Sequence, residues 1–299
     1  MPRAKEFCTL EALKAGATLA GTAPQISHYI LIEYPGVWPA RAVEDAPQFS
    51  DAVKEHLAAQ LKTLPHPRIL FIRKEGQARS KTRQVFFIAA STTQPWVAQR
   101  IVSATYAELE ELNFKEIFTQ AQPVKALDML LVCTHGTRDG CCGTFGGKTY
   151  KALQTKMPDW DVWQCSHVGG HRLAPCVVHP ATGRYYGHVF AEKVDDFSSS
   201  LQHNAIATSY CRGCSLWPAP AQAAELAVRE KVAEIAGEAF EVEQQSELCC
   251  RVFHPSSGQA WQVELLCVPE HEEEVLCSCM PPKRQKIFSY KPKNISLCG

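Results

Sequence analysis

The most informative part of this chain reads Leu130-Leu-Val-Cys133-Thr-His-Gly-Thr-Arg-Asp-Gly-Cys141-Cys142-Gly and continues, after a gap, as Trp163-Gln-Cys-Ser-His167-Val-Gly-Gly-His171. An apolar run ends on a cysteine, a glycine-bearing loop carries two more cysteines, and two histidines follow at positions i and i+4. Two thiolates and two imidazoles form a complete ligand set for tetrahedral zinc or for a two-iron cluster. The segment therefore predicts a metal site.

The candidate ligands are Cys133, one of the adjacent pair Cys141 and Cys142, and the histidines His167 and His171. The residues alone do not choose within the cysteine pair, but one is expected to be a ligand while its neighbour points away. Two glycines between the histidines disfavour a regular helix, so we expect a loop that aims both rings at one point. The alternative for Cys133 is a buried core thiol, and for the histidines it is ordinary hydrogen bonding in a loop.

Bulk properties restrict the class of protein. The chain has 299 residues, 45% of them hydrophobic and 21% charged, which is ordinary for a folded protein. The formal net charge is zero, so nothing points to nucleic acid. No apolar run approaches the roughly 20 residues that span a bilayer, and the N-terminus lacks a signal-peptide core, so we expect a cytoplasmic protein without membrane insertion. Fourteen cysteines without such a signal favour metal or redox chemistry over disulfides.

The elements expected around the central segment occur twice in the same order: strand, helix, strand, hairpin, helix. This order describes a thioredoxin-like unit, so we expect an α/β (α+β) fold with tandem thioredoxin-like units at 1–124 and 125–210. The segments 31–36 and 131–136 align locally, with Glu33 in the place of Cys133. The first unit is then a degenerate copy that serves as scaffold or docking surface. The expected elements are 29–34, 50–64, 69–72, 84–89 with 97–101, and 107–118, then 129–132, 145–157, 160–165, 176–179 with 185–190, and 191–201.

The last part of the chain, 211–299, is expected to form a small α+β domain. It contains a helix over 221–240, a hairpin of 247–254 with 259–268, and a charge-rich, partly ordered tail. Cys211 and Cys214 form a Cys-x-x-Cys pair, a possible dithiol that raises the alternative of a thiol–disulfide oxidoreductase. Thioredoxin chemistry, however, requires the pair at the start of the first helix after a strand. A near match to a phosphate-binding loop at 142–149 lacks its first glycine, so a nucleotide site is not expected.

The motif Cys-Thr-His-Gly-x-Arg-Asp-x-Cys-Cys, followed by Ser-His-Val-Gly-Gly-His-Arg, resembles the sucrase/ferredoxin-like family, which groups with thioredoxin-like [2Fe-2S] ferredoxins. The likeness spans about residues 8–230, and further matching segments are 19–23, 33–38, 185–188 and 212–216. It implies a [2Fe-2S] cluster on Cys133, Cys142, His167 and His171, with Cys142 preferred over Cys141 because the family spacing is Cys-x8-Cys. Cys211 and Cys214 depart from the family pattern. The word "sucrase" implies a hydrolase, but no motif supplies the carboxylate pair that glycoside hydrolysis needs.

The function expected from this ligand set is one-electron transfer or redox response. Two neutral imidazoles in place of two thiolates remove negative charge, which raises the potential and couples it to protons. An electron carrier is favoured over an enzyme with its own substrate, and no nicotinamide motif is present, so a separate reductase or redox partner protein is expected. Arg172 is a candidate for tuning or docking, and Tyr185 for packing over the cluster. The alternative is a structural zinc-binding interaction protein.

Overall fold

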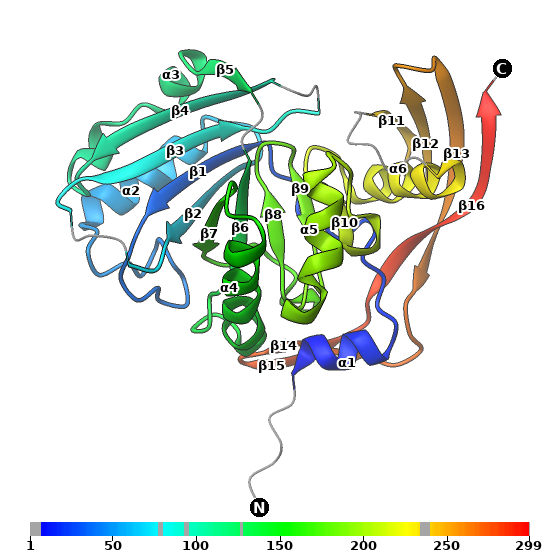
Figure 1. Ribbon diagram of the computed structural model, residues 1–299, viewed down its shortest axis with the longest axis horizontal. Coiled ribbons are helices and arrows are strands. Elements are labelled where there is room, and N and C mark those ends of the chain that lie inside the picture. The colour runs from blue at the N-terminus through cyan, green and yellow to red at the C-terminus, as the bar shows by residue number, and fades with distance from the viewer. Residues whose placement is uncertain (1–6, 77–79, 93–95, 126–127, 234–239, 299) are drawn as a thin grey trace, which may run out of the picture.

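The computed structural model describes residues 7–76, 80–92, 96–125, 128–233 and 240–298 (Figure 1). Within these ranges the chain forms a ten-stranded mixed sheet, a four-stranded sheet and a two-stranded hairpin, with helices packed on the sheet faces. The expected mixed α/β (α+β) class is confirmed. None of the described helices has the length and apolarity needed to cross a bilayer.

The first half of the large sheet is built on a parallel strand pair. β1 lies parallel to β2 and antiparallel to β3, and β4 and β5 extend the sheet outward. A parallel pair needs a crossover, which α2 supplies; Ser50 caps this helix by accepting a hydrogen bond from the Val53 N–H at 3.2 Å. The elements are β1 (His28–Glu33), α2 (Asp51–Leu61), β2 (Pro67–Arg73), β3 (Arg83–Ala89), β4 (Trp96–Ala104), η1 (Glu108–Glu111), α3 (Phe114–Thr119) and β5 (Gln122–Lys125).

The second half repeats this plan. β6 lies parallel to β7 and antiparallel to β8, and β9 and β10 follow outward. The elements are β6 (Met129–Cys133), η2 (Cys142–Gly146), α4 (Gly147–Lys156), β7 (Asp161–Cys165), η3 (His171–Leu173), β8 (Val177–His179), β9 (Arg184–Tyr186), η4 (Ala191–Lys193), α5 (Val194–Gln202), η5 (Thr208–Tyr210) and β10 (Cys211–Cys214).

The halves join edge to edge through a short antiparallel contact between β2 and β7, where Ile72 pairs with Cys165 and Arg73 with Gln164. The resulting order is β10-β9-β8-β6-β7-β2-β1-β3-β4-β5. Outward from the join between β2 and β7, the strands of the first half follow in the order β2, β1, β3, β4, β5. Those of the second half follow in the equivalent order β7, β6, β8, β9, β10. The strand order and strand directions are therefore the same in both halves, and the join makes one continuous sheet.

Successive side chains of β6 point into two different hydrophobic cores, because side chains of a strand alternate between the two faces of the sheet. Leu130 and Val132 face the core covered by α4 and α5, whereas Leu131 and Cys133 face the opposite core. That second core is closed by α1 (Cys8–Lys14) and by β14 (Val275–Cys279). Cys133 therefore lies on the face that these two segments cover.

One predicted helix is split in the structure. The segment 107–118 was expected to be continuous, but it divides into η1 and α3 because Leu112 is extended, with ψ of 121°. Asn113 then begins the second helix by accepting a hydrogen bond from the Glu116 N–H at 3.1 Å. Short polar side chains compete with helix continuation in this way and favour caps.

The C-terminal part combines α6 (Ala219–Val232) with the four-stranded sheet β11 (Glu241–Ser246), β12 (Cys249–His254), β13 (Gln259–Pro269) and β16 (Phe288–Cys298). The expected hairpin appears as β12 and β13. The expected helix over 221–240 ends at Val232, and residues 234–239 lie outside the described ranges. The charge-rich segment forms β14, β15 (Pro282–Gln285) and β16, and in Figure 1 the β14–β15 hairpin lies beside α1, away from the four-stranded sheet.

A buried ion triad ties α6 to the large sheet. Arg184 of β9 donates two hydrogen bonds to the Glu225 carboxylate, at 2.8 and 2.6 Å, and the Arg229 Nε donates to the same group. All three side chains are at least nine-tenths buried. Burial alone would raise the pKa of Glu225, but the two guanidinium groups outweigh it and hold that pKa below its usual value.

Glu225→Ala is expected to lower the free energy of unfolding by about 3–5 kcal/mol, because it leaves buried arginines without their counter-charge. Glu230→Ala, on the exposed side of the same helix, is the control and should change it by less than about 0.5 kcal/mol. Because folding lowers this pKa, the contribution is present above the unfolded value near 4.3 and is lost as pH falls through the folded value. Urea unfolding at neutral and acidic pH measures both effects; equal losses in the two variants would contradict the account.

Candidate metal centre

Cys133 is the last residue of β6 and is fully buried. Its backbone N–H donates to the Cys176 carbonyl at 3.0 Å, and the Thr134 N–H donates to the Cys165 carbonyl at 3.1 Å. Because β6 and β7 are parallel, with Cys133 and Cys165 in register, the loops that follow them leave the sheet at the same edge. Ligand sites of open α/β sheets form at such carboxyl ends.

Close backbone approaches at glycines shape the loop after β6. A Cβ on Gly143 would lie 2.6 Å from the Cα of Gly136, and a Cβ on Gly146 would lie 2.0 Å from the Cys133 carbonyl oxygen. Gly146 has helical backbone angles, so glycine is needed there for space and not for a left-handed conformation. These contacts fold η2 back onto the end of β6 and bring Cys142 to Cys133.

The two adjacent cysteines face different groups. The sulfur atoms of Cys133 and Cys142 and a ring nitrogen of His167 all lie within 4.8 Å of one another. The Cys142 Sγ is 3.9 Å from the His167 Nδ1. The Cys141 sulfur instead belongs to a second group with Cys8, Asp139 and Cys279. Cys142, and not Cys141, therefore lies beside Cys133 in the structure.

The pKa values of the two adjacent thiols, Cys133 and Cys142, are displaced in opposite directions. A hydrogen bond from the Cys142 thiol, together with His167, holds the pKa of Cys133 well below its usual value despite complete burial. The same hydrogen bond and burial raise the pKa of Cys142 well above its usual value. A buried pair that already stabilises one thiolate is prepared for a cationic group, since metal ligation requires thiolates.

His135 orients the loop that carries His167. The His167 backbone N–H donates to the His135 Nδ1 at 3.1 Å, so the proton of this ring lies on Nε2, which donates to the Pro39 carbonyl at 2.8 Å. Burial lowers the pKa of His135 and keeps the ring neutral. Trp38 contacts the ring edge-on, with centroids 5.8 Å apart. The segment after β1 in the first half thereby contacts His135, which supports the His167 loop of the second half.

His171 lies beside the group but outside its tightest part. It begins η3 after Gly169 and Gly170, which have φ values of +86° and +73°. Its ring centroid is 5.1 Å from that of His167. Its buried Nδ1 has no hydrogen-bond partner among the described residues, and the Asp139 Oδ2 is 3.7 Å away. Burial lowers the pKa of His171 and so favours the neutral ring, the form that can bind a metal.

Arg212 holds the loop that carries His167 and His171 through a hydrogen bond to its backbone. Arg212 was not singled out as a site residue from the sequence. Its buried guanidinium donates to the Gly169 carbonyl at 3.0 Å and to the Thr22 hydroxyl at 3.1 Å. A Cβ on Gly170 would lie 2.5 Å from this guanidinium. The partners lie 43 and 190 residues away along the chain, so no local pattern distinguishes Arg212 from a surface arginine. Cys8 and Cys279 were missed for the same reason, whereas Asp139 lies within the quoted motif but was not singled out.

Two residues expected to tune the site are both buried. Arg172 donates to both Glu270 carboxylate oxygens, at 3.2 and 3.3 Å, and its side chain is 10% exposed. Its docking role stays a prediction, and the structure gives this charge an internal partner. Tyr185 belongs to the same core as Cys133, and burial raises its pKa to about 12. The Arg212 guanidinium lies 5.6 Å from the Tyr185 ring centre.

Cys211 and Cys214 lie on β10, at the end of the ten-stranded sheet, and are not brought to the Cys133 group. Both are buried free thiols. Burial raises the pKa of Cys211, and it raises that of Cys214 to about 11. A reactive dithiol needs an accessible thiol of lowered pKa. The structure therefore gives no support to the dithiol as a nucleophile.

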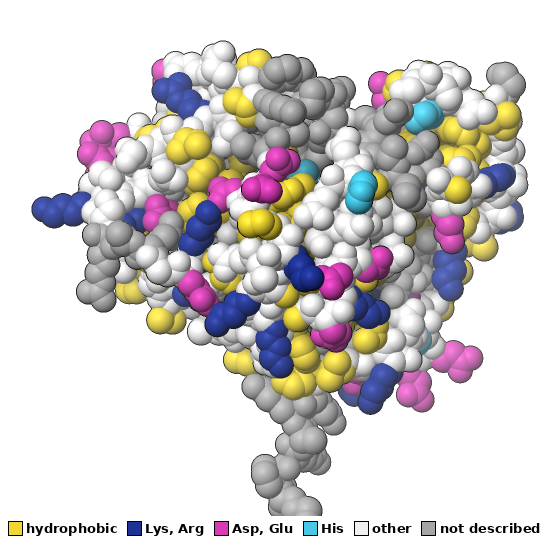
Figure 2. Space-filling model, viewed as in Figure 1, with side chains coloured by type: hydrophobic (Ala, Val, Ile, Leu, Met, Phe, Trp, Pro, Cys, Tyr) yellow, Lys and Arg dark blue, Asp and Glu magenta, His cyan; other side chains and the backbone are white. Residues whose placement is uncertain are grey.

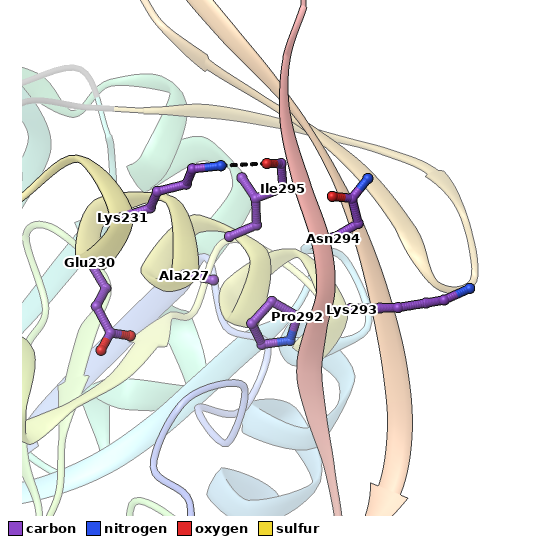
Figure 3. Close-up of a pocket in the computed structure, with 7 residues that line it drawn as sticks. All are labelled: Ala227, Glu230, Lys231, Pro292, Lys293, Asn294 and Ile295. Carbon is purple, nitrogen blue, oxygen red and sulfur yellow. Dashed lines mark hydrogen bonds between the residues drawn. The ribbon is translucent and has the colours of Figure 1, made fainter.

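One open groove lies on the surface of the described part of the chain. A shallow groove between α6 and β16 is lined by Ala227, Glu230, Lys231 and residues 292–295, and it contains no cysteine or histidine (Figure 3). The Lys231 ammonium donates to the Ile295 carbonyl across it. On the face shown in Figure 2, basic and acidic side chains are interspersed over the surface. The cysteine and histidine groups therefore remain the strongest chemical feature.

Comparison with known proteins agrees with the motif. The family model described as sucrase/ferredoxin-like matches residues 19–213, more than half of the chain. The altered inheritance of mitochondria protein 32 of Debaryomyces hansenii is 34% identical over 96 residues, covering 29% of this chain. The matched region spans about a third of that relative, 33% of its length. No solved structure matches. The resemblance expected from the sequence is confirmed: the chain belongs to the sucrase/ferredoxin-like family.

Proposed function

We propose that this protein is a [2Fe-2S] electron-transfer or redox-responsive protein whose cluster is held by Cys133, Cys142, His167 and His171. The observation that carries the proposal is the convergence of three of these donors within 4.8 Å, beside a fourth whose buried Nδ1 lacks a hydrogen-bond partner among the described residues. The family description as ferredoxin-like supports the same conclusion.

The three donors within 4.8 Å of one another would also suit a single ion, so the family description is what favours a two-iron group. Bonds of 2.0–2.3 Å to a tetrahedral zinc place all four donors within about 4 Å of one another. Here His171 stands outside the group of three, although its ring is adjacent to that of His167. Two thiolates and two imidazoles that span a larger volume are the donor set of a Rieske-type cluster.

The repeated strand order supports the proposal that the halves are tandem thioredoxin-like units. In that arrangement the second unit, about 125–210, holds the cluster, and the first, about 1–124, acts as scaffold. Its segment Trp38–Pro39 already contacts His135 beneath the site. A cytoplasmic reductase or another redox protein is proposed as the partner that exchanges electrons.

The bound cluster would supply a one-electron couple. Around it, the chain provides two thiolate charges in place of the four of a plant-type ferredoxin. His171 is 20% exposed while its Nδ1 is buried, so the remaining side of the ring is the part that solvent reaches. A ring nitrogen there takes up or releases a proton as the charge of the site changes.

His171→Cys is expected to keep the iron but to lower the reduction potential by about 100 mV or more and to flatten its pH dependence. The reason is that a neutral, protonatable ligand is replaced by an anionic one. His203→Cys, an exposed position after α5, is the matched control and should leave both quantities unchanged. Protein-film voltammetry between pH 5 and 9 measures the effect. An unchanged potential in His171→Cys would show that His171 is not a ligand.

A further inference from the structure

A second group of possible metal donors includes Cys141, the sequence neighbour of Cys142 in the first group. Cys8 of α1, Asp139 and Cys141 of the loop after β6, and Cys279 of β14 place their donor atoms within 4.8 Å of one another. The Cys141 sulfur is 3.4 Å from that of Cys8 and 3.3 Å from that of Cys279. Cys8, Asp139 and Cys141 are fully buried, and Cys279 is half-buried. Three thiols and a carboxylate from distant parts of the chain therefore meet at one point.

The backbone around this group is arranged to stabilise negative charge. The Cys8 N–H donates to the Cys279 sulfur at 3.1 Å, and the Thr9 N–H donates to the Cys141 sulfur. Both Asp139 oxygens accept backbone hydrogen bonds, one from Cys141 at 2.9 Å and one from Cys279 at 3.0 Å. Each carboxylate oxygen retains a lone pair for a further partner. Such N–H donors to sulfur and oxygen are the outer partners that orient metal ligands.

We propose that Cys8, Cys141, Cys279 and Asp139 form a second metal site that binds one Zn²⁺. Three thiolates and one carboxylate make a complete tetrahedral set, and soft thiolate donors select zinc over magnesium or calcium. All four positions belong to this chain, so the site is closed and structural. Each thiol that binds the ion releases its proton.

The zinc site would join α1 and β14 to the loop after β6, which also carries Cys142. Cys8 and Cys279 are 271 residues apart, and α1 and β14 together cover the core that contains Cys133. Asp139 contacts both groups, because its Oδ2 lies 3.7 Å from the His171 Nδ1. The adjacent residues Cys141 and Cys142 would then bind two different metals, which explains why two cysteines stand side by side in this loop.

A disulfide is the competing state for three thiols this close together. It would consume two sulfur atoms and leave the third thiol and the Asp139 carboxylate, which keeps its two backbone N–H donors, without a shared partner. A metal ion engages all four groups at once and offsets two of their four negative charges, while backbone N–H donors stabilise the sulfur of Cys279 and the Asp139 carboxylate. The two states differ in the number of thiols that alkylate after denaturation and in metal content, so one sample distinguishes them.

The test measures zinc and iron together by mass spectrometry of the full-length protein, purified anaerobically. The wild type is expected to carry about one zinc per chain, and Cys8→Ser and Cys279→Ser are expected to lose it while keeping their iron. Cys267→Ser, an exposed cysteine of β13, is the matched control and should keep both metals. Cys279→His, which restores a zinc ligand, is expected to recover the ion.

A second measurement on the wild type guards against variants that fail to fold. A mercurial reagent that modifies thiols should release zinc to a chromogenic chelator, and Co²⁺ added in its place should give the intense thiolate-to-metal absorption of a tetrahedral site. Wild-type protein without zinc, or with two fewer alkylatable thiols, would overturn the proposal. So would zinc that persists in both serine variants. Because iron is read separately, failure here is distinguishable from failure of the cluster proposal.

Discussion

Cys142→Ser is expected to abolish the visible colour of the protein and to reduce its iron content more than about tenfold. Removing even an outer-shell partner of a metal ligand costs 10–100-fold in affinity, and here one of only two anionic ligands is lost. Cys133 would then be the one thiolate left among the proposed ligands. Iron, acid-labile sulfide and the visible spectrum of the anaerobically purified variant measure the effect.

The adjacent cysteine makes this test position-specific. Cys141→Ser changes the same chemistry one residue earlier, but its sulfur belongs to the group with Cys8 and Cys279. It is expected to retain its visible absorption and to lose zinc. Cys267→Ser controls for general effects of removing a thiol. Retention of colour in Cys142→Ser together with its loss in Cys141→Ser would reverse the assignment of the two residues.

Gly146→Ala is expected to destabilise the fold by about 3 kcal/mol or more and to prevent assembly of the metal centre. The added Cβ would lie 2.0 Å from the Cys133 carbonyl oxygen, which is backbone and cannot move aside as a side chain can. Overpacking against a flexible neighbour already costs about 1–3 kcal/mol. Relief of this clash would separate η2 from the end of β6 and carry Cys142 away from Cys133.

The next residue supplies the matched control. A Cβ on Gly147 meets nothing within 4 Å, and Gly147 is the first residue of α4. Gly147→Ala is therefore expected to stabilise the protein by up to about 1 kcal/mol through helix propensity and to keep full iron content. Urea unfolding and iron assay of the two variants compare the positions directly. Equal behaviour of both variants would contradict the role of Gly146 as a close-approach glycine.

The fold and the first donor group were largely readable from sequence because their signals are local. The strand that ends at Cys133, the Ser50 cap and the paired glycines before His171 each lie within a few residues of the feature they determine. Cys142 is the instructive exception. Its spacing from Cys133 identified it by resemblance, but only the approach of Gly146 to Cys133 explains why Cys142, and not Cys141, turns toward the site.

The second donor group could not be read from sequence because no segment contains more than part of it. Cys8 and Cys279 resemble ordinary small buried residues until α1 and β14 are placed side by side in three dimensions. The same applies to Arg212, whose partners are distant in the chain. Residues of this kind are determined by tertiary packing, and local pattern carries no information about which strands and helices will meet.

The most direct test of the central claim is an assay of iron, acid-labile sulfide and visible absorption on one anaerobically purified sample, before and after dithionite. The account predicts a coloured protein with about two irons and two sulfides per chain, partly bleached on reduction. An iron-free, colourless protein whose Cys133 group holds zinc, shown by zinc loss in Cys133→Ser, would contradict it.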